Sequence, residues 1–330
     1  MKEKIDIVIT WVDGNDPKWI EEKAKYSTKV SNSSSYFRDW GMLKYIFRSI
    51  EKYASWFNNV YLITWGHIPE WLNTECQNLK IINHKDYIPS KYLPTFSSHT
   101  IELNFNKITE LSENFVYFND DTILNNKTES TNFFKNGIPC MSAILSPIIC
   151  NNKSHFENIL ANNMNVINKH FNKKEVMKKN KFKFINLKYG SQLFRTLLVS
   201  PWHNFVGFYN QHVPSSLCKS TIDKVWKEEN ELLDATCSHK FRNSYMDVNQ
   251  YLFNYYQICT GKFVPRKINI AKYMELHDYN FEEIKNEIKK GKSKLLCIND
   301  SDDIKNFENL KRQLLETLEN KFPDKSKFER

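Results

Sequence analysis

The chain has 330 residues, of which 41% are hydrophobic and 14% aromatic, enough to bury a large core. This length and composition exclude an intrinsically disordered protein and favour one large α/β domain or a domain with a substantial insertion. The net charge of +9 at pH 7 favours acidic partners: nucleotide diphosphates, phosphorylated polymers, nucleic acid or an anionic membrane surface.

Cysteine spacing and hydropathy indicate the cellular compartment in which the protein is expected. Seven cysteines are scattered singly with no Cys-x-x-Cys pair, which argues against a disulfide framework or a structural zinc site. The N-terminal apolar run is broken by Asp6 and Asp13 and is too short and acidic for a signal peptide. No stretch is long and apolar enough to cross a bilayer. We therefore expect a cytoplasmic protein and leave open a peripheral association with the inner face of the cell membrane.

The first strand signal is the apolar run Ile5–Trp11, which ends in the turn formers Val-Asp-Gly-Asn-Asp-Pro. Asp13 therefore lies just past a strand. Gly14 permits a close backbone approach, and Pro17 can begin a helix over residues 18–25. A plain strand–turn–helix accounts for the glycine and the proline. It accounts less well for Asp13, because a first βα loop is the usual place for nucleotide phosphates or their metal.

A Ser-rich linker at residues 31–35 precedes Arg38. Apolar residues then recur at helical spacing and predict an amphipathic helix from Trp40 to Tyr53. A cation at the start of a helix faces the positive end of the helix dipole, so Arg38 suggests an anionic ligand outside the helix. Further strands are predicted at Val60–Thr64 and Leu79–Asn83.

A hydroxyl-rich loop after Tyr92 leads into the next helix, with Ser97 or Ser98 as its natural N-cap. Glu102 is expected in the first turn of this helix. There the helix dipole gives a carboxylate a structural role, which competes with a catalytic one.

The segment Phe115–Asp121 is an aromatic and β-branched run that ends in Asn119 and two carboxylates. It predicts a buried strand with acid at its carboxyl end. Ligands of open α/β sheets bind outside the carboxyl ends of the strands, so Asp120 and Asp121 are candidate contacts of a metal ion or polar substrate. A simple turn after a strand is the alternative interpretation.

The same pattern returns at Leu295–Asp300, where a short apolar run ends in Asn299 and Asp300. Together with Asp13 and the Asp120–Asp121 pair, this makes three polar strand ends. We predict one mostly parallel sheet in which these three ends converge on a single crevice.

Between these strands, residues 125–202 are polar, rich in Asn and Lys, and weakly periodic, which predicts a helical insertion. We expect the proline that follows in His212-Val-Pro to hold the backbone of His212 extended and so to aim the imidazole. A helix is predicted from Ile222 to Leu233. Arg242 can fork onto phosphate oxygens. The tyrosine-rich stripe from Tyr245 to Tyr256 is interpreted as core.

Taken together, these segments resemble the four conserved regions of the Stealth family of capsule and surface-polysaccharide hexose-1-phosphate transferases. The catalytic core of that family is similar to that of the lysosomal-enzyme GlcNAc-1-phosphotransferase. The resemblance implies a single catalytic domain over residues 1–330, in which 125–202 is variable, and a Rossmann-like α/β fold with helices on both faces of a mostly parallel sheet. The matching segments are Asp6–Pro17, Arg38–Asn73, Leu93–Ser98, Phe115–Asp121, His212–Tyr256 and Cys297–Asp300.

The resemblance also implies a reaction. A sugar 1-phosphate would pass from a nucleotide diphospho-sugar, such as a UDP-hexose or UDP-N-acetylhexosamine, to a hydroxyl of a growing polysaccharide or lipid-linked glycan, and a nucleoside monophosphate would leave. A metal-dependent glycosyltransferase that releases a nucleoside diphosphate is the nearest alternative. A nucleic-acid-binding protein is disfavoured, because the cations are spread along the chain and no recognition module is present.

Residue roles follow from this chemistry. Asp120 and Asp121 are predicted to hold Mg²⁺ or Mn²⁺. Arg242 would stabilise charge on the transferred phosphoryl group, with help from Arg38. The candidate bases are His212, which suits neutral pH, and the carboxylates of Asp13 and Glu102, and the choice among the three stays open. The remaining predicted substrate contacts are Gly14, Ser97, Asn119 and Asn299.

Overall fold

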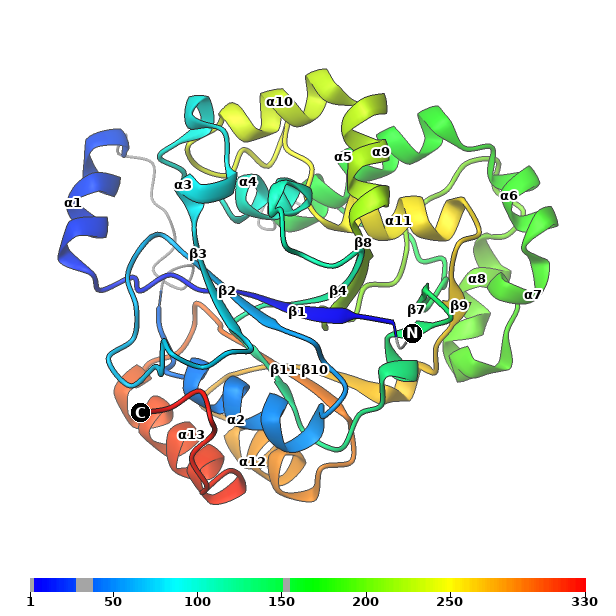
Figure 1. Ribbon diagram of the computed structural model, residues 1–330. Helices are drawn as coiled ribbons and strands as arrows, with labels where there is room; N and C mark the ends of the chain where they lie inside the picture. The colour runs from blue at the N-terminus through cyan, green and yellow to red at the C-terminus, as the bar shows by residue number, and fades with distance from the viewer. Residues whose placement is uncertain (1–2, 28–37, 151–154) are drawn as a thin grey trace.

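The structure is a computed structural model that describes residues 3–27, 38–150 and 155–330. Its centre is a five-stranded sheet with the strand order β3-β2-β1-β4-β8 (Figure 1). The first four strands along the chain are mutually parallel, and β8 runs antiparallel to β4. The predicted α/β fold with a mostly parallel sheet is therefore confirmed. The strands are β1 (Ile5–Thr10), β2 (Val60–Thr64), β3 (Leu79–Asn83), β4 (Asn114–Phe118) and β8 (Ser215–Cys218).

The strand at Leu295 is not part of this sheet, and here the prediction was wrong. It is β11 (Leu295–Asn299), which pairs in parallel with β10 (Ala271–Glu275) and antiparallel with β5 (Thr122–Leu124). The reason is that the chain turns straight from β4 into β5, so that β5 offers β11 a partner outside the central sheet. The ends of β4 and β11 nevertheless meet, because Ile298 N donates to Asp121 O at 2.9 Å.

Alternating side chains explain why the central sheet is covered on both faces. Val8, with Tyr61 of β2, faces one hydrophobic cluster, while Ile7 and Ile9 face the other. Strands buried on both faces are typical of parallel sheets. In Figure 1 one set of helices lies above the sheet and another below it. Above lie α4 (Ser98–Leu103), α5 (His155–His170), α9 (Lys219–Glu228), α10 (Asn230–Ser238) and α11 (Tyr251–Cys259); below lie α2 (Leu43–Tyr53), α12 (Phe281–Lys290) and α13 (Phe307–Lys321).

Helix boundaries were predicted unevenly. The helix expected at residues 18–25 is α1 (Pro17–Tyr26), whose Asp16 N-cap accepts from two backbone N–H groups. The single helix expected at 222–233 is instead two helices, α9 and α10, divided at Glu229. The Glu229 carboxylate accepts from Lys169 Nζ at 2.7 Å and contacts His170, and these contacts hold it at the break between the helices. The predicted linker at 31–35 lies outside the described residues.

The segment 125–202 contains strands as well as helices. Besides α5 it carries α6 (Lys173–Lys179), α7 (Lys181–Phe184) and α8 (Leu193–Val199), and a hairpin of β6 (Phe134–Lys135) and β7 (Ile138–Met141). The hairpin turns at Asn136 and Gly137, with φ of 51° and 73°. Asn-Gly is the strongest short hairpin signal, because both residues tolerate positive φ. β7 also pairs with β9 (Val264–Pro265). That this segment varies within the family stays a prediction.

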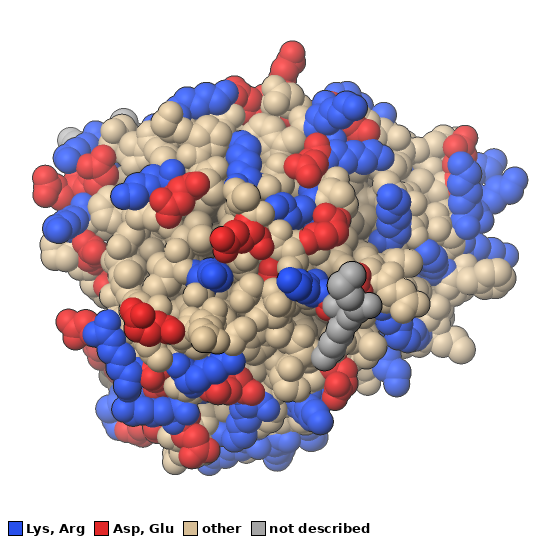
Figure 2. Space-filling view, in the orientation of Figure 1, with Lys and Arg blue, Asp and Glu red and all other residues tan. Residues whose placement is uncertain are grey.

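On the face seen in Figure 2, basic and acidic side chains are interspersed, with a denser basic group over α6 and α7. Among the described residues, no helix combines the length and apolar character needed to cross a bilayer.

A buried ion pair fixes the C-terminal segment to α2. Arg48 Nε and Nη2 donate to the two oxygens of Glu329, each at 2.8 Å, and Nη1 donates to Phe322 O at 2.6 Å. The side chains of Arg48 and Glu329 are only 3% and 2% exposed. Both charges are therefore paired and out of water, and loss of Arg48 would leave buried Glu329, among the described residues, with only the longer ion-pair contact to Lys44 Nζ at 3.8 Å.

We expect Arg48→Met to destabilise the protein by about 3–5 kcal/mol, the usual cost of breaking a buried pair from one side. Urea unfolding followed by circular dichroism measures this. The control is Arg312→Met, because Arg312 pairs with Glu316 on the surface, where both side chains are at least 60% exposed. The control should change stability by no more than about 1 kcal/mol. Equal effects of the two substitutions would contradict the assigned role of the buried pair.

Candidate active site

The turn between β4 and β5 carries the predicted acidic residues. Phe118 ends β4 inside the core, and Thr122 begins β5 in the second sheet. Asn119, Asp120 and Asp121 fill the turn between the two sheets. Because Asp121 O accepts from β11, the turn is tied to the end of that strand.

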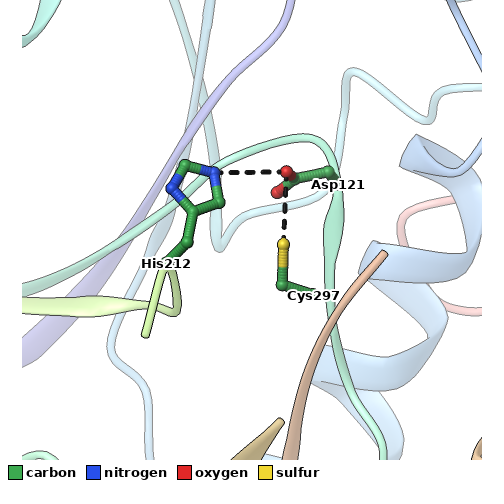
Figure 3. A group of neighbouring side chains, drawn as sticks. All are labelled: Asp121, His212 and Cys297. Carbon is green, nitrogen blue, oxygen red and sulfur yellow. Dashed lines mark hydrogen bonds and ion pairs between the residues drawn. The ribbon is translucent and has the colours of Figure 1, made fainter. Parts of the chain in front are cut away.

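Three side chains from separate segments meet beside this turn (Figure 3). Asp121 Oδ2 lies 3.3 Å from His212 Nε2, and the Cys297 thiol donates to the same oxygen at 3.3 Å. Thr122 Oγ1 donates to Asp121 Oδ1 at 2.9 Å. The ligand-type atoms of Asp121, His212 and Cys297 all lie within 4.8 Å of one another. Asp121 is thus the centre of the cluster.

The backbone of His212 is left-handed, with φ of 46°, so the predicted extended conformation was wrong. The proline follows Val213 and restrains that residue, not His212. Side chains with a Cβ adopt positive φ at an energetic cost, and such strain is found where the surroundings impose it. Here Tyr251 Oη lies 3.1 Å from Nδ1, and the Asn119 amide lies 3.2 Å from Nε2. Tyr251 therefore belongs to the site and not only to the core stripe.

The Asp121–His212 pair is electrostatically matched. Burial alone would lower the pKa of His212, but the Asp121 carboxylate, aided by Glu102, raises it above the usual 6.5. Burial would likewise raise the pKa of Asp121, yet the His212 charge keeps it below its usual value. Because the carboxylate holds Nε2–H, Nδ1 is the nitrogen free to accept a proton once Tyr251 gives way.

Asp120 lies in a different environment from its neighbour. Its side chain reaches solvent, although the surrounding protein displaces part of the hydration water of the carboxyl group. This desolvation raises the pKa of Asp120 to about 7, together with the charges of Asp121 and Asp39, and the charge of Arg242 opposes the rise. Crowded carboxylates repel one another, and a divalent cation would relieve that repulsion. Carboxylate oxygens are the ligands that Mg²⁺ and Mn²⁺ prefer, so the residues present fit such an ion.

Arg242 lies on a loop that is held by a buried carboxylate. Asp247 accepts from Asn243 N at 2.8 Å, and its two oxygens lie 2.6 Å from His239 Nδ1 and 3.2 Å from His99 Nδ1. Arg242 Nη2 in turn donates to Ser98 Oγ at 2.8 Å. These contacts fix the loop to α4 and so fix the position of the guanidinium.

Glu102 is not in the first turn of its helix, and the expected dipole contact was wrong. It is the fifth residue of the six-residue α4, close to the C-terminal end of the helix. The buried carboxylate accepts from Tyr117 Oη at 3.1 Å and from Gln250 N at 3.4 Å. Ser97 is the N-cap residue, as predicted, but its buried hydroxyl has no hydrogen-bond partner within the described part of the chain.

Asp13 and Gly14 lie in the loop after β1. Asp13 N donates to His67 Nε2 at 2.8 Å, and Asp13 Oδ1 accepts from Asn15 N at 2.9 Å. Gly14 has no positive φ, so its backbone conformation is open to other residues. The contacts of Asp13 are thus with its own loop and the loop after β2, and its catalytic role stays a prediction.

Arg38 and Asn299 lie beside Asp300, at the end of β11. Arg38 binds both carboxylate oxygens of Asp300, through Nε and Nη2, each at 2.8 Å. Asn299 Nδ2 donates to Asp300 O at 2.9 Å. A phosphate would have to displace Asp300 to bind the guanidinium of Arg38. In the structure this arginine therefore makes a structural contact, and its predicted role toward substrate stays a prediction.

Three contributors escaped the sequence prediction: Cys297, Tyr251 and Asp247. A signal existed for Cys297, because residues two apart on a strand share a face and Asn299 was already a candidate. Tyr251 is distant in sequence from His212, so no spacing could indicate it. Asp247 lies close to Asn243 and His239 in sequence, but its contact with His99 joins segments that are far apart.

The raised pKa of His212 can be measured in the metal-free protein. We expect ring NMR titration to give His212 a pKa above 6.5 and Asp121→Asn to lower it, because the carboxylate no longer offsets burial. Asp324→Asn, at an exposed position, serves as the control and should leave the titration unchanged. An unaltered His212 titration in Asp121→Asn would refute the pairing.

Comparison with known proteins gives the family. Models described as Stealth protein CR1, conserved region 1, and CR2, conserved region 2, match residues 3–31 and 36–141. The capsular polysaccharide phosphotransferase WcwK of Streptococcus pneumoniae is 40% identical over 99% of this chain and 98% of its own. The exopolysaccharide phosphotransferase cps2G of Lactiplantibacillus plantarum is 41% identical over 99% of this chain and 96% of its own.

Among solved structures, the chain overlaps the WbbM bifunctional glycosyltransferase apo structure with a TM-score of 0.38 and 10% identity, covering 97% of this chain and 50% of that one.

The assignment of the later segments to the third and fourth conserved regions rests on their residues alone. The near-complete alignment with polysaccharide phosphotransferases, together with the two region matches, shows that this chain is a transferase enzyme and belongs to the Stealth family.

Proposed function

We propose that the protein transfers a sugar 1-phosphate from a nucleotide diphospho-sugar, a UDP-hexose or UDP-N-acetylhexosamine, to a hydroxyl of a growing cell-surface glycan. The products are a phosphodiester and a nucleoside monophosphate. The observation that carries the proposal is the Asp121–His212 pair, which lies within electrostatic reach of Arg242. The names of the relatives support it. The proposal places the reaction in the cytoplasm, as the sequence predicts.

His212 would act as the base. The acceptor hydroxyl replaces Tyr251 at Nδ1 and gives up its proton while its oxygen attacks the sugar-side phosphorus. The bond between that phosphorus and the bridging oxygen breaks, and the nucleoside monophosphate leaves with the electron pair. Asp121 stabilises the imidazolium that forms. We favour His212 over Glu102 and Asp13 because the Asp121 carboxylate beside its imidazole raises the pKa of His212.

The charges of the diphosphate would be balanced from two sides. Arg242, fixed by the Asp247 contacts, would donate to oxygens of the transferred phosphoryl group, where charge develops. Asp120 and Asp121 would hold a divalent cation, and Asp121 would share its carboxylate with His212. When bound, the cation would neutralise the diphosphate. Ser97, Asn119 and Asn299 remain proposed substrate contacts, and Arg38 a proposed helper.

Product analysis separates this reaction from glycosyl transfer. We expect phosphorus NMR of the purified product to show a phosphodiester and chromatography to show a nucleoside monophosphate, because the bond that breaks lies between the two phosphates. A glycoside free of phosphorus, formed with release of a nucleoside diphosphate, would overturn the proposal in favour of the glycosyltransferase.

The proposed metal contact can be tested with a change of charge and little change of shape. Asp120→Asn should abolish transfer and weaken activation by Mg²⁺ or Mn²⁺, while thermal unfolding stays near that of the parent protein. The Asp324→Asn control should retain full activity. Full activity of the parent protein in chelator, or of Asp120→Asn at ordinary metal concentrations, would contradict the role.

A further inference from the structure

A cavity of about 460 Å³ lies between the β6–β7–β9 sheet and the turn Ile268–Ile270. None of its lining residues belongs to the candidate active site. Among the described residues that line it there is no Asp or Glu, while six are basic. The basic residues are Lys135, Lys188, Arg266, Lys267, Lys292 and Lys294.

Arg266 makes this cavity more than a basic surface. Its Nε and Nη1 atoms are buried, and neither has a hydrogen-bond partner within the described part of the chain. Burial lowers the pKa of the Arg266 guanidinium, but an arginine stays charged in proteins. In the buried Arg48, by contrast, Nε and Nη2 both donate to the Glu329 carboxylate. Two buried guanidinium nitrogens without partners are costly in the absence of a counter-ion, so the chemistry of the cavity calls for an anion.

We propose that this cavity binds a phosphodiester group within the acceptor glycan, one made in an earlier round of transfer. The inference rests on the proposed function, in which each product carries a new phosphodiester. The unused N–H donors of Arg266 would bind phosphate oxygens, and the surrounding lysines would add charge. The neutral lining residues Thr131, Asn132 and Asn269 offer hydrogen bonds to neighbouring sugar hydroxyls.

The cavity is placed to serve the active site. Gln211, the neighbour of His212, donates through Nε2 to Ile268 O at 3.0 Å, so the cavity wall touches the segment that carries the proposed base. Beyond Ile270, β10 leads to Tyr273, whose ring lies edge-on to His212 with 6.0 Å between centroids. Three strand residues span about 10 Å, so only a short stretch of chain separates Ile270 in the cavity wall from Tyr273 beside His212.

A membrane surface is the less favoured ligand. A bilayer meets protruding side chains, whereas the unpaired donors of Arg266 are buried inside a concavity. A phosphodiester on a flexible glycan can enter the cavity, and an anionic headgroup held in a bilayer cannot do so without leaving its plane.

Binding can be measured without turnover. The probe is the methyl phosphodiester of glucose 1-phosphate, followed by calorimetry, with methyl glucoside as the uncharged comparison. We expect one site for the phosphodiester and none for the glycoside. Arg266→Met should weaken binding about 10- to 100-fold, as expected for loss of charged hydrogen bonds. Arg312→Met, which removes a surface arginine that is paired with Glu316, should leave binding unchanged.

Thermal unfolding separates a binding role from a structural one. Without the probe, Arg266→Met should unfold at a higher temperature than the parent protein, because an uncompensated buried charge is gone. The rise in unfolding temperature that the probe causes in the parent protein should disappear. A lower unfolding temperature without the probe would make Arg266 a structural residue.

Turnover and binding measurements on variants identify the ligand and its site. In turnover, Arg266→Met should raise KM for an acceptor that contains a phosphodiester and leave kcat, and KM for a phosphate-free acceptor, unchanged. Loss of probe binding in His212→Gln but not in Arg266→Met would place the probe at the active site and overturn the inference. Arg266-dependent binding to phosphatidylglycerol vesicles without binding of the probe would do the same. A glycosyl-transfer product would reject the proposed function but leave these binding results standing.

Discussion

The carboxylate of Asp121 is shared between two parts of the molecule, and the rest of the site depends on that sharing. His212 approaches one of its oxygens from the segment before β8, and Cys297 donates to the same oxygen from β11. The turn that carries Asp121 also connects β4 of the central sheet to β5 of the second sheet. A single residue therefore contacts both β11 and the proposed base: its backbone carbonyl accepts from Ile298 N, and its side chain pairs with His212.

Four of the arginines described above show how pairing decides the role of a cation. The guanidinium groups of Arg48 and Arg38 each bind a carboxylate and so hold two segments of the chain together. Arg242 donates to a neutral hydroxyl, and its position is set by a buried aspartate on its own loop. Arg266 has buried donors without partners among the described residues. Arg48 and Arg38 would each have to release a carboxylate to bind an anion, whereas Arg266 would not, as far as the described residues show.

Much of the fold could be predicted because long apolar runs bounded by turn formers leave few alternatives. The strands at Val60 and Leu79 have the predicted bounds, and β1 and β4 differ from prediction by one residue at an end. The pairing of β11 with β5 could not be predicted, because it depends on contacts between residues far apart in sequence. The same holds for the site: polar strand ends indicated Asp120 and Asp121, whereas the interactions of Asp121 with His212 and of Asp120 with Arg242 bring in distant segments that spacing does not show.

The left-handed backbone of His212 has a consequence for how members of such a family diverge. A histidine at φ of 46° carries strain that glycine, or to a lesser degree asparagine, would not. Stability alone therefore favours replacement of this residue, and only use of the imidazole opposes it. A descendant that kept the fold but no longer needed the reaction would drift toward glycine or asparagine here, so the residue at this position reports whether selection for catalysis persists.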